Sequence, residues 1–322
     1  MHIYQPVRTP LEKGFSLIEF MIAITIAMII LLAVSIAWQS GLATQNTQTD
    51  ASRLNETVRY AIDLLSREIK QAGLINTTNL SNGITPELNF CSTTSVGGAI
   101  AGANDPTTIN PTISGATIST GAGVSVSNLS DVIRIRYYGD DPNAGGAALG
   151  TEPTYDCQGN TVPAGQLVED TLFVQPLDPA NPTTTEPALW CYTSNTNAAT
   201  KSVPIVVGVE SLQILYGEDM PDPTSGLYDG IINHYVPWQL LNNGINQNSD
   251  NVLSVKVSIV ARGANPVIVG TAAVSKTYQH FGTSYSDPGG TTGTTFTNTA
   301  DKRLRLPHPL STEIAVRNFS HC

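Results

Sequence analysis

Charged side chains are scarce in this chain of 322 residues, because Asp, Glu, Lys and Arg together make up only 13%. That is about half the share usual in soluble proteins. Basic residues are the scarcer sign, with 16 Lys and Arg against 26 Asp and Glu and a formal net charge of -10. Proteins that bind nucleic acids need basic patches to contact phosphates, so this balance excludes nucleic acid as a partner. Uncharged residues fill the gap, among them 27 glycines and 20 prolines, a composition typical of turn-rich β structure.

Motifs for catalysis and for zinc binding are missing as well. The histidines are scattered without an H-E-x-x-H pattern, and the chain has no nucleophile elbow, P-loop or dinucleotide-binding glycine motif. The four cysteines include no C-x-x-C pair, which argues against a zinc site. The sequence therefore predicts no enzymatic activity, no catalytic residues and no bound cofactor.

One acidic segment offers the oxygen ligands that calcium prefers. Asp219, Asp222 and Asp229 lie close together in the sequence, without the spacing of an EF-hand. Water solvates such carboxylates as readily as a cation binds them, so the segment is a weak calcium candidate. Calcium is the one metal that the sequence suggests.

A long hydrophobic run lies near the N-terminus. The 19 residues Phe20–Trp38 contain only Thr25 and Ser35 as polar members, and no charge occurs between Glu19 and Asp50. Nineteen helical residues extend roughly 28 Å, about the thickness of the hydrocarbon core of a bilayer. The run therefore predicts a single membrane-spanning helix. Its basic leader should stay in the cytoplasm while the rest of the chain crosses outward.

The residues just before this run resemble a processing signal. Residues 1–14 form a short polar leader, and residues 13–19 read KGFSLIE. This motif resembles the class III signal of type IV prepilins. The resemblance implies that a prepilin peptidase at the inner membrane cleaves between Gly14 and Phe15 and N-methylates Phe15. The hydrophobic run is then retained in the mature chain.

The resemblance to prepilins gives Glu19 a role, which neither a plain membrane anchor nor a secretory signal does. An unpaired carboxylate at the edge of a membrane helix costs on the order of 2–3 kcal/mol. In type IV pilins the glutamate of the motif pairs with the N-terminal amine of a neighbouring subunit, so the resemblance assigns Glu19 to assembly. A plain membrane anchor leaves Glu19 unexplained. An ordinary secretory signal would need a small-residue cleavage site after Trp38, and the sequence has no convincing one.

The helical pattern continues beyond the hydrophobic run. Apolar residues recur at spacings of three and four, an amphipathic stripe made of Leu54, Val58, Ile62, Leu65 and Ile69. Such a stripe predicts the helix face of a head domain, and Gly73 is the predicted C-cap. The expected divisions are a cleaved leader (1–14), a transmembrane and filament-core helix (15–39), an amphipathic continuation (40–73) and a periplasmic or extracellular β-rich head (74–322).

Alternating apolar residues predict strands throughout the head. The predicted strands are 131–138, 171–174, 188–192, 210–216, 251–261, 267–274 and 312–316. In the first of them Arg134 and Arg136 fall on the polar face. Segments 92–128 and 284–300 have low complexity and are predicted loops. The expected fold class is α+β and pilin-like, a long N-terminal helix packed on an antiparallel sheet with an additional β-rich region.

The four cysteines all follow the hydrophobic run. In an oxidising compartment Cys91, Cys157, Cys191 and Cys322 should form disulfides, and four cysteines allow three pairings. We favour Cys157 with Cys191, because each lies beside a predicted strand. That choice pairs Cys91 with Cys322.

Several head segments resemble the minor pilins of the PilW family. These segments are 208–219, 252–262, 303–305, 316–318 and the surroundings of Cys157 and Cys191. The resemblance implies a minor pilin that takes part in priming pilus assembly and sits at or near the tip. Its partners would be the prepilin peptidase, other minor pilins, the major pilin and a tip adhesin. The chain would lie in the inner membrane with its head in the periplasm, and after assembly in the pilus at the cell surface.

Two other functions stay open on the sequence. A minor pseudopilin of a type II secretion system, J-like in kind, shares the N-terminus and the helix-plus-sheet plan. A membrane-anchored periplasmic enzyme or binding protein could also use a pilin-like export signal. The mature chain of 322 − 14 = 308 residues is large for a subunit repeated along a fibre, which favours a low-copy pilus subunit.

Overall fold

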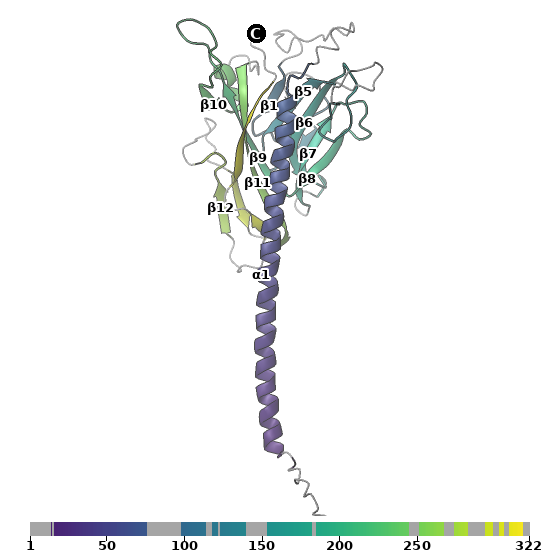
Figure 1. Ribbon diagram of the computed structural model, residues 1–322, viewed down its shortest axis with the longest axis vertical. Coiled ribbons are helices and arrows are strands. Elements are labelled where there is room, and N and C mark those ends of the chain that lie inside the picture. Colours follow the sequence, from purple (N-terminus) through teal and green to yellow (C-terminus); the bar gives the residue numbers. More distant parts are fainter. Residues whose placement is uncertain are drawn as a thin grey trace, which may run out of the picture. The chain divides into compact units, whose positions relative to one another are not determined.

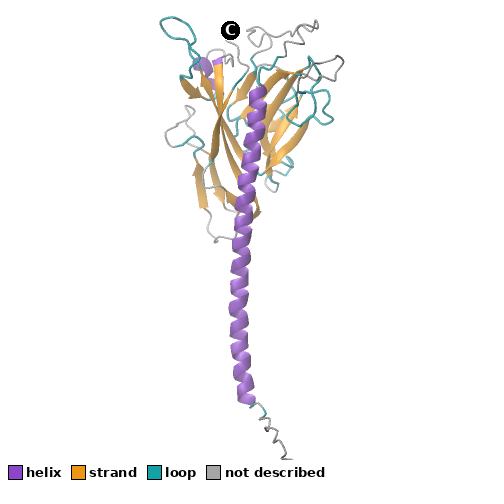
Figure 2. Cartoon of the chain, viewed as in Figure 1, coloured by secondary structure: helices purple, strands orange, loops and turns teal. Residues whose placement is uncertain are grey.

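The computed structural model describes residues 14, 16–75, 98–113, 118–121, 123–139, 153–181, 185–244, 251–266, 274–282, 294–298, 303–305 and 309–317. By its internal contacts the chain divides into two units, Met1–Gln48 and Thr49–Cys322. The described residues form one long helix, a short 3-10 helix and antiparallel strands (Figures 1 and 2). This combination of a long helix and antiparallel sheets confirms the predicted α+β fold class.

The long helix α1 spans Leu17–Gln71. It runs through Gly41 without a break, although glycine is a poor helix former. Gly73 follows the helix with a φ of 72°, the left-handed conformation of a C-cap, as predicted. Its N–H donates to the carbonyl oxygen of Arg136 at 2.9 Å. The end of the helix is thereby tied to a strand of the head.

The C-terminal part of α1 contributes one face to the core of the second unit. The buried residues of this face are Leu54, Val58, Ala61, Leu64, Leu65, Ile69 and Ala72. The predicted stripe is therefore confirmed at four of its five positions. At the fifth, Ile62 is only partly buried, and the neighbouring Ala61 is fully buried in its place. Burial of each large apolar side chain contributes about 1.5–3 kcal/mol, so this face holds the helix on the head.

The first sheet has the strand order β1-β5-β6-β7-β8 and is antiparallel throughout. Its strands are β1 (Ile100–Ala103), β5 (Val132–Tyr138), β6 (Leu167–Pro176), β7 (Pro187–Thr193) and β8 (Ser202–Val207). In the centre of the sheet Leu172 lies opposite Ile133 on one side and Cys191 on the other. The three predicted strands between residues 131 and 192 correspond to β5, β6 and β7.

The second sheet has the order β10-β9-β11-β14, and β15 also pairs with β11. Its strands are β9 (Val209–Glu218), β10 (His234–Val236), β11 (Val252–Pro266), β14 (Arg303–Arg305) and β15 (Leu310–Ala315), and a 3-10 helix spans Trp238–Gly244. The predicted strands 210–216, 251–261 and 312–316 correspond to β9, β11 and β15. Most of the predicted strand 267–274 lies outside the described residues.

A single glycine connects the two sheets. Gly208 lies between the last residue of β8 and the first of β9 and has a φ of 93°. A Cβ at this position would come within 3.0 Å of the carbonyl oxygen of Arg262 on β11. Only glycine combines this left-handed backbone with so close an approach, and it lets the chain turn directly from one sheet into the other.

Short strands occupy segments that the sequence predicted as loops. Within 92–128 the structure has β1 and a small sheet of β2 (Thr108–Asn110), β3 (Ser119–Thr120) and β4 (Val124–Ser125). Within 284–300 it has β13 (Thr294–Asn298), which pairs with β12 (Val274–Tyr278). Ile109 is fully buried in the core. Strands of two to five residues carry too little periodicity to be recognised in a Gly/Ser/Thr-rich background.

The structure also corrects the polar face predicted for strand β5. Arg134 and Arg136 are buried, with 0% and 1% exposure. Nε of Arg136 donates to Oε1 of Glu169 at 2.9 Å, and Nε of Arg134 donates to Oγ1 of Thr171 at 3.0 Å. Alternation in the sequence distinguishes the two faces of a strand, but it does not show whether another segment of the chain packs on the polar face. Here both faces are covered.

Candidate functional site

The start of α1 places the carboxylate of Glu19 at the helix N-terminus. The backbone N–H of Ser16 donates to Oε2 of Glu19 at 2.9 Å, and the carbonyl oxygen of Ser16 accepts from the N–H of Phe20 at 3.1 Å. Ser16 is therefore the N-cap, and Glu19 is the acidic residue of a capping box. The described helix begins at Leu17. The S-x-x-E spacing of Ser16 and Glu19 is the sequence signal that could have predicted where the helix begins.

The N-terminal unit exposes an apolar helical surface. Its apolar segment is long and hydrophobic enough to cross a membrane, and none of that segment is buried against the described chain. Oγ1 of Thr25 donates to the carbonyl oxygen of Ile22 at 2.8 Å. Oγ of Ser35 donates in the same way to Leu31 at 2.8 Å. Because both polar side chains are satisfied within the helix, this segment fits a membrane-anchored protein. Gly14 is exposed, and Phe15 lies outside the described residues.

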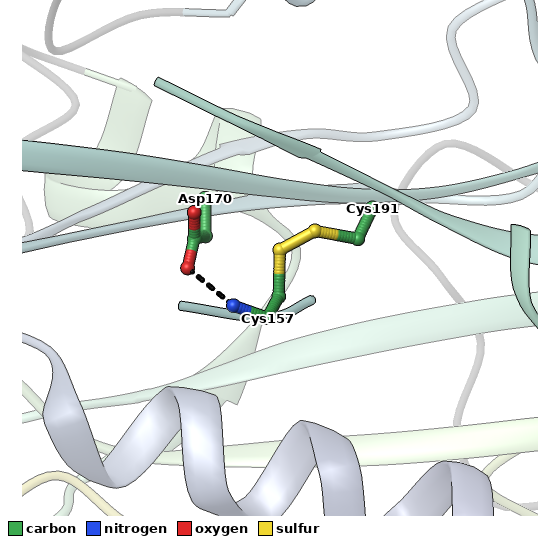
Figure 3. A group of neighbouring side chains, drawn as sticks. All are labelled: Cys157, Asp170 and Cys191. Atoms are coloured by element: carbon green, nitrogen blue, oxygen red, sulfur yellow. Dashed lines mark hydrogen bonds between the residues drawn. A yellow bond between two sulfur atoms is a disulfide. The ribbon is translucent and has the colours of Figure 1, made fainter. Parts of the chain in front are cut away.

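In the head a disulfide joins Cys157 to Cys191 on β7, across 34 residues of sequence (Figure 3). This is the pairing that the sequence analysis favoured. By loop entropy it contributes about 3–4 kcal/mol to stability. Cys91 and Cys322 lie outside the described residues, so their pairing stays a prediction.

Asp170 on β6 lies beside this disulfide, with its side chain pointing toward Cys157 (Figure 3). The backbone N–H of Cys157 donates to Oδ2 of Asp170 at 2.9 Å, and the hydroxyl of Tyr137 donates to the same oxygen at 2.6 Å. Asp170 is fully buried. Burial raises the pKa of its carboxyl to about 7 despite these donors.

Glu68 is a second buried carboxyl, and it sits on the buried face of α1. It is 0% exposed. Its Oε1 accepts from Nη2 of Arg67 at 2.8 Å and from Nε at 3.1 Å, and Nε2 of Gln71 donates to Oε2 at 3.3 Å. Burial, followed by the negative charge of Asp170, raises the pKa of Glu68 to about 8. The sequence analysis missed both carboxyls, although Glu68 stands three residues after Leu65, on the apolar stripe.

Asp156 completes the acidic cluster from the loop between β5 and β6. Its Oδ1 accepts from the backbone N–H groups of Gln158 and Asn160 at 2.9 and 2.8 Å, and its Oδ2 accepts from Nδ2 of Asn195 at 2.8 Å. The side chain is fully buried. Asp156 therefore closes a tight turn and holds the disulfide-bonded loop in shape.

Metal binding finds limited support in the described part of the chain. The single group of potential ligands found there is Cys157, Asp170 and Cys191, and its two sulfurs are joined in the disulfide. Asp222 and Asp229 of the acidic segment accept hydrogen bonds from nearby backbone N–H groups, Thr224 and Ser225 for the first and Ile231 for the second. Calcium binding at Asp219, Asp222 and Asp229 stays a prediction. A titration that gives neither heat nor a higher melting temperature would contradict it.

Comparison with known proteins gives two family matches. Residues 10–35 match the prokaryotic N-terminal methylation motif. Residues 179–318 match PilW, described as type IV pilus-assembly protein W. A solved structure of a type IV-like pilin from Thermus thermophilus has 15% sequence identity, covers 83% of this chain and 97% of its own, and gives a TM-score of 0.37. No protein with a curated description matches the chain.

Proposed function

We propose that the chain, which matches the PilW family of type IV pilus-assembly proteins over residues 179–318 and the N-terminal methylation motif over residues 10–35, is a minor pilin that helps to prime pilus assembly and sits at or near the tip. The observation that carries the proposal is the exposed apolar surface of α1, none of which the described chain covers. Such a surface needs lipid before assembly and the helices of other pilins afterwards.

Maturation begins, in this proposal, at the junction of Gly14 and Phe15. The prepilin peptidase removes residues 1–14 on the cytoplasmic side and N-methylates Phe15. The hydrophobic run then anchors residues 15–39 in the inner membrane, with the continuation 40–73 and the head 74–322 in the periplasm. Gly14 is exposed, as a cleavage site must be.

Glu19 provides the assembly contact after cleavage. Before assembly its carboxylate is an exposed acceptor for the Ser16 N–H. A new amine at Phe15 of a neighbouring subunit offers a full positive charge at a similar depth, which is a stronger partner for the carboxylate in a low-dielectric environment. Charge neutralisation between subunits therefore favours their association. Other minor pilins and the major pilin are the expected partners, and a tip adhesin is a further one.

Substitution of Glu19 tests this role. Glu19→Ala should leave cleavage after Gly14 intact and impair piliation, because the neighbouring amine loses its counter-charge. Glu56→Ala is the matched control, since Glu56 is an exposed acid further along the same helix. Mature chain on an immunoblot and pili in electron micrographs are the two readouts. Normal piliation in the Glu19 variant would contradict the assembly role.

The phenotype of a deletion strain distinguishes a pilus subunit from a pseudopilin of a type II secretion system. Deletion of the gene should abolish twitching motility and leave exoprotein secretion intact if the chain serves a pilus. The reverse pattern would assign it to a type II secretion system. Loss of neither function would favour a membrane-anchored periplasmic enzyme or binding protein.

A further inference from the structure

The head contains two buried carboxyls on different elements, Glu68 on α1 and Asp170 on β6. Both are fully buried. Arg67 bonds Glu68 and reaches the carbonyl oxygen of Asp156, and the N–H of the next residue, Cys157, donates to Asp170 at 2.9 Å. These contacts place the two carboxyls in one buried cluster, and the charge of Asp170 accordingly contributes to raising the pKa of Glu68. Both carboxyls lie where the last turns of α1 pack on the first sheet. The buried apolar residues Leu65 and Ile69 flank Glu68 in the sequence.

The surroundings of the pair supply too little positive charge for two anions. Arg67 is the one cation that bonds Glu68 among the described residues, and half of its side chain is exposed. Its Nη2 also reaches the carbonyl oxygen of Asp156 at 3.4 Å. The carboxylate of Asp156 adds a third negative charge from the loop, and it raises the proton affinity of both Glu68 and Asp170.

The remaining groups that face the pair are neutral donors. Tyr137 on β5 donates its hydroxyl to Asp170, Thr193 on β7 contributes a side-chain hydrogen bond, and the N–H of Cys157 contributes a third. Tyr137 stays protonated, because burial and the charge of Asp170 raise its pKa well above 10. The disulfide to Cys191 keeps the Cys157 N–H in place.

We propose that Glu68 and Asp170 form a proton-dependent latch between α1 and the first sheet. With a proton on each carboxyl the two side chains are neutral and the helix packs on the sheet without charge repulsion. When both carboxyls ionise, two anions lie buried in the same cluster, their charges repel each other and the helix end loosens. The inference concerns the head alone and does not depend on the assignment to a pilus.

The direction of the pH dependence follows from the two pKa values. In the folded chain they are about 8 for Glu68 and about 7 for Asp170, against ordinary values of 4.5 and 3.8. The folded state therefore binds protons more tightly than the unfolded state. The stability that this provides is complete below the ordinary values and is lost as the pH rises through 7 and then 8. Alkaline conditions open the latch.

The experiment compares melting temperatures of the full chain in a non-ionic detergent, from about pH 5 to about pH 9. The variant is Glu68→Gln, which mimics the protonated carboxyl. The control is Glu56→Gln, which removes one negative charge from the exposed side of the same helix. At about pH 9 we expect Glu68→Gln to melt higher than the control by about 2–4 °C or more. At about pH 5 the two should agree.

Amide hydrogen exchange locates the effect. After correction for the intrinsic pH dependence, amides of residues 61–72 should lose protection in the wild type above about pH 8, and Glu68→Gln should keep it. Equal melting profiles for Glu68→Gln and Glu56→Gln would overturn the proposal. If Glu68→Gln does not fold, Asp170→Asn replaces it, and a wild-type alkaline decline that persists in Asp170→Asn overturns the proposal in the same way.

Discussion

At the residue scale, the stability of the head depends more on buried ion pairs than on exposed ones. Arg136 and Glu169 pair at 2.9 Å with side chains 1% and 6% exposed. Lys256 and Glu313 pair at 3.7 Å with side chains 35% and 50% exposed. Both pairs join a basic side chain to a glutamate, but their surroundings differ. Water screens the second pair, whereas removal of one partner from the first leaves a charge in the protein interior.

This difference predicts unequal effects of the same substitution. Glu169→Gln should lower the free energy of unfolding by about 3–5 kcal/mol, because the guanidinium of Arg136 then lies buried beside a neutral amide. Glu313→Gln should lower it by about 1 kcal/mol or less. Urea denaturation of the full chain in detergent at neutral pH measures both. Similar losses for the two variants would show that the buried pair is not the stronger one.

At the element scale, α1 is one helix with two different apolar surfaces. Leu65, in the part that belongs to the head unit, is fully buried, whereas Leu31, in the N-terminal unit, is 65% exposed. The same side chain therefore stabilises the fold at one position and is available to lipid or to other subunits at the other. A substitution series along the helix should separate folding from assembly.

We expect Leu65→Ala to cost about 2–5 kcal/mol of unfolding free energy, since it removes a buried side chain and leaves a cavity. Leu31→Ala should leave the unfolding free energy of the head unchanged within about 0.5 kcal/mol. Denaturation followed by near-ultraviolet circular dichroism reports on the head for both variants. A large loss in Leu31→Ala would mean that the N-terminal part of the helix is packed against the chain.

The long elements were predictable from the sequence because each has many periods. The stripe from Leu54 to Ile69 and the alternation in β9 and β11 identified the helix face and the central strands. The covered polar face of β5 and the short strand β1 were not predictable, since both depend on which distant segment packs on them. Glu68 shows the same limit. Its place on an apolar stripe is visible in the sequence, but the partner Asp170 comes from a strand about a hundred residues away.

At the scale of the whole molecule, charge and hydrophobicity are divided between two parts of the chain. The apolar window of α1 lies in an uncharged stretch, and the acidic residues lie mainly in the head. The leader carries two bases, Arg8 and Lys13, and one acid, Glu12. Its removal changes the side-chain charge from -10 to 14 − 25 = -11. The proposed cleavage would thus remove the basic end and leave an acidic head on the apolar helix.

The match to the N-terminal methylation motif predicts how the N-terminus is processed. Intact-mass spectrometry of the wild type from membranes should give a chain that begins at Phe15 and carries the added mass of one methyl group. Gly14→Ala should retain residues 1–14, because it changes the glycine that directly precedes the proposed cut. Gly41→Ala is the control, since a Cβ there meets nothing within 4 Å and the helix tolerates alanine. The control should be processed like the wild type. A wild-type chain cut after Trp38 would mean that the hydrophobic run is a removable secretory signal, and neither the membrane anchor nor the assembly role of Glu19 would survive that result.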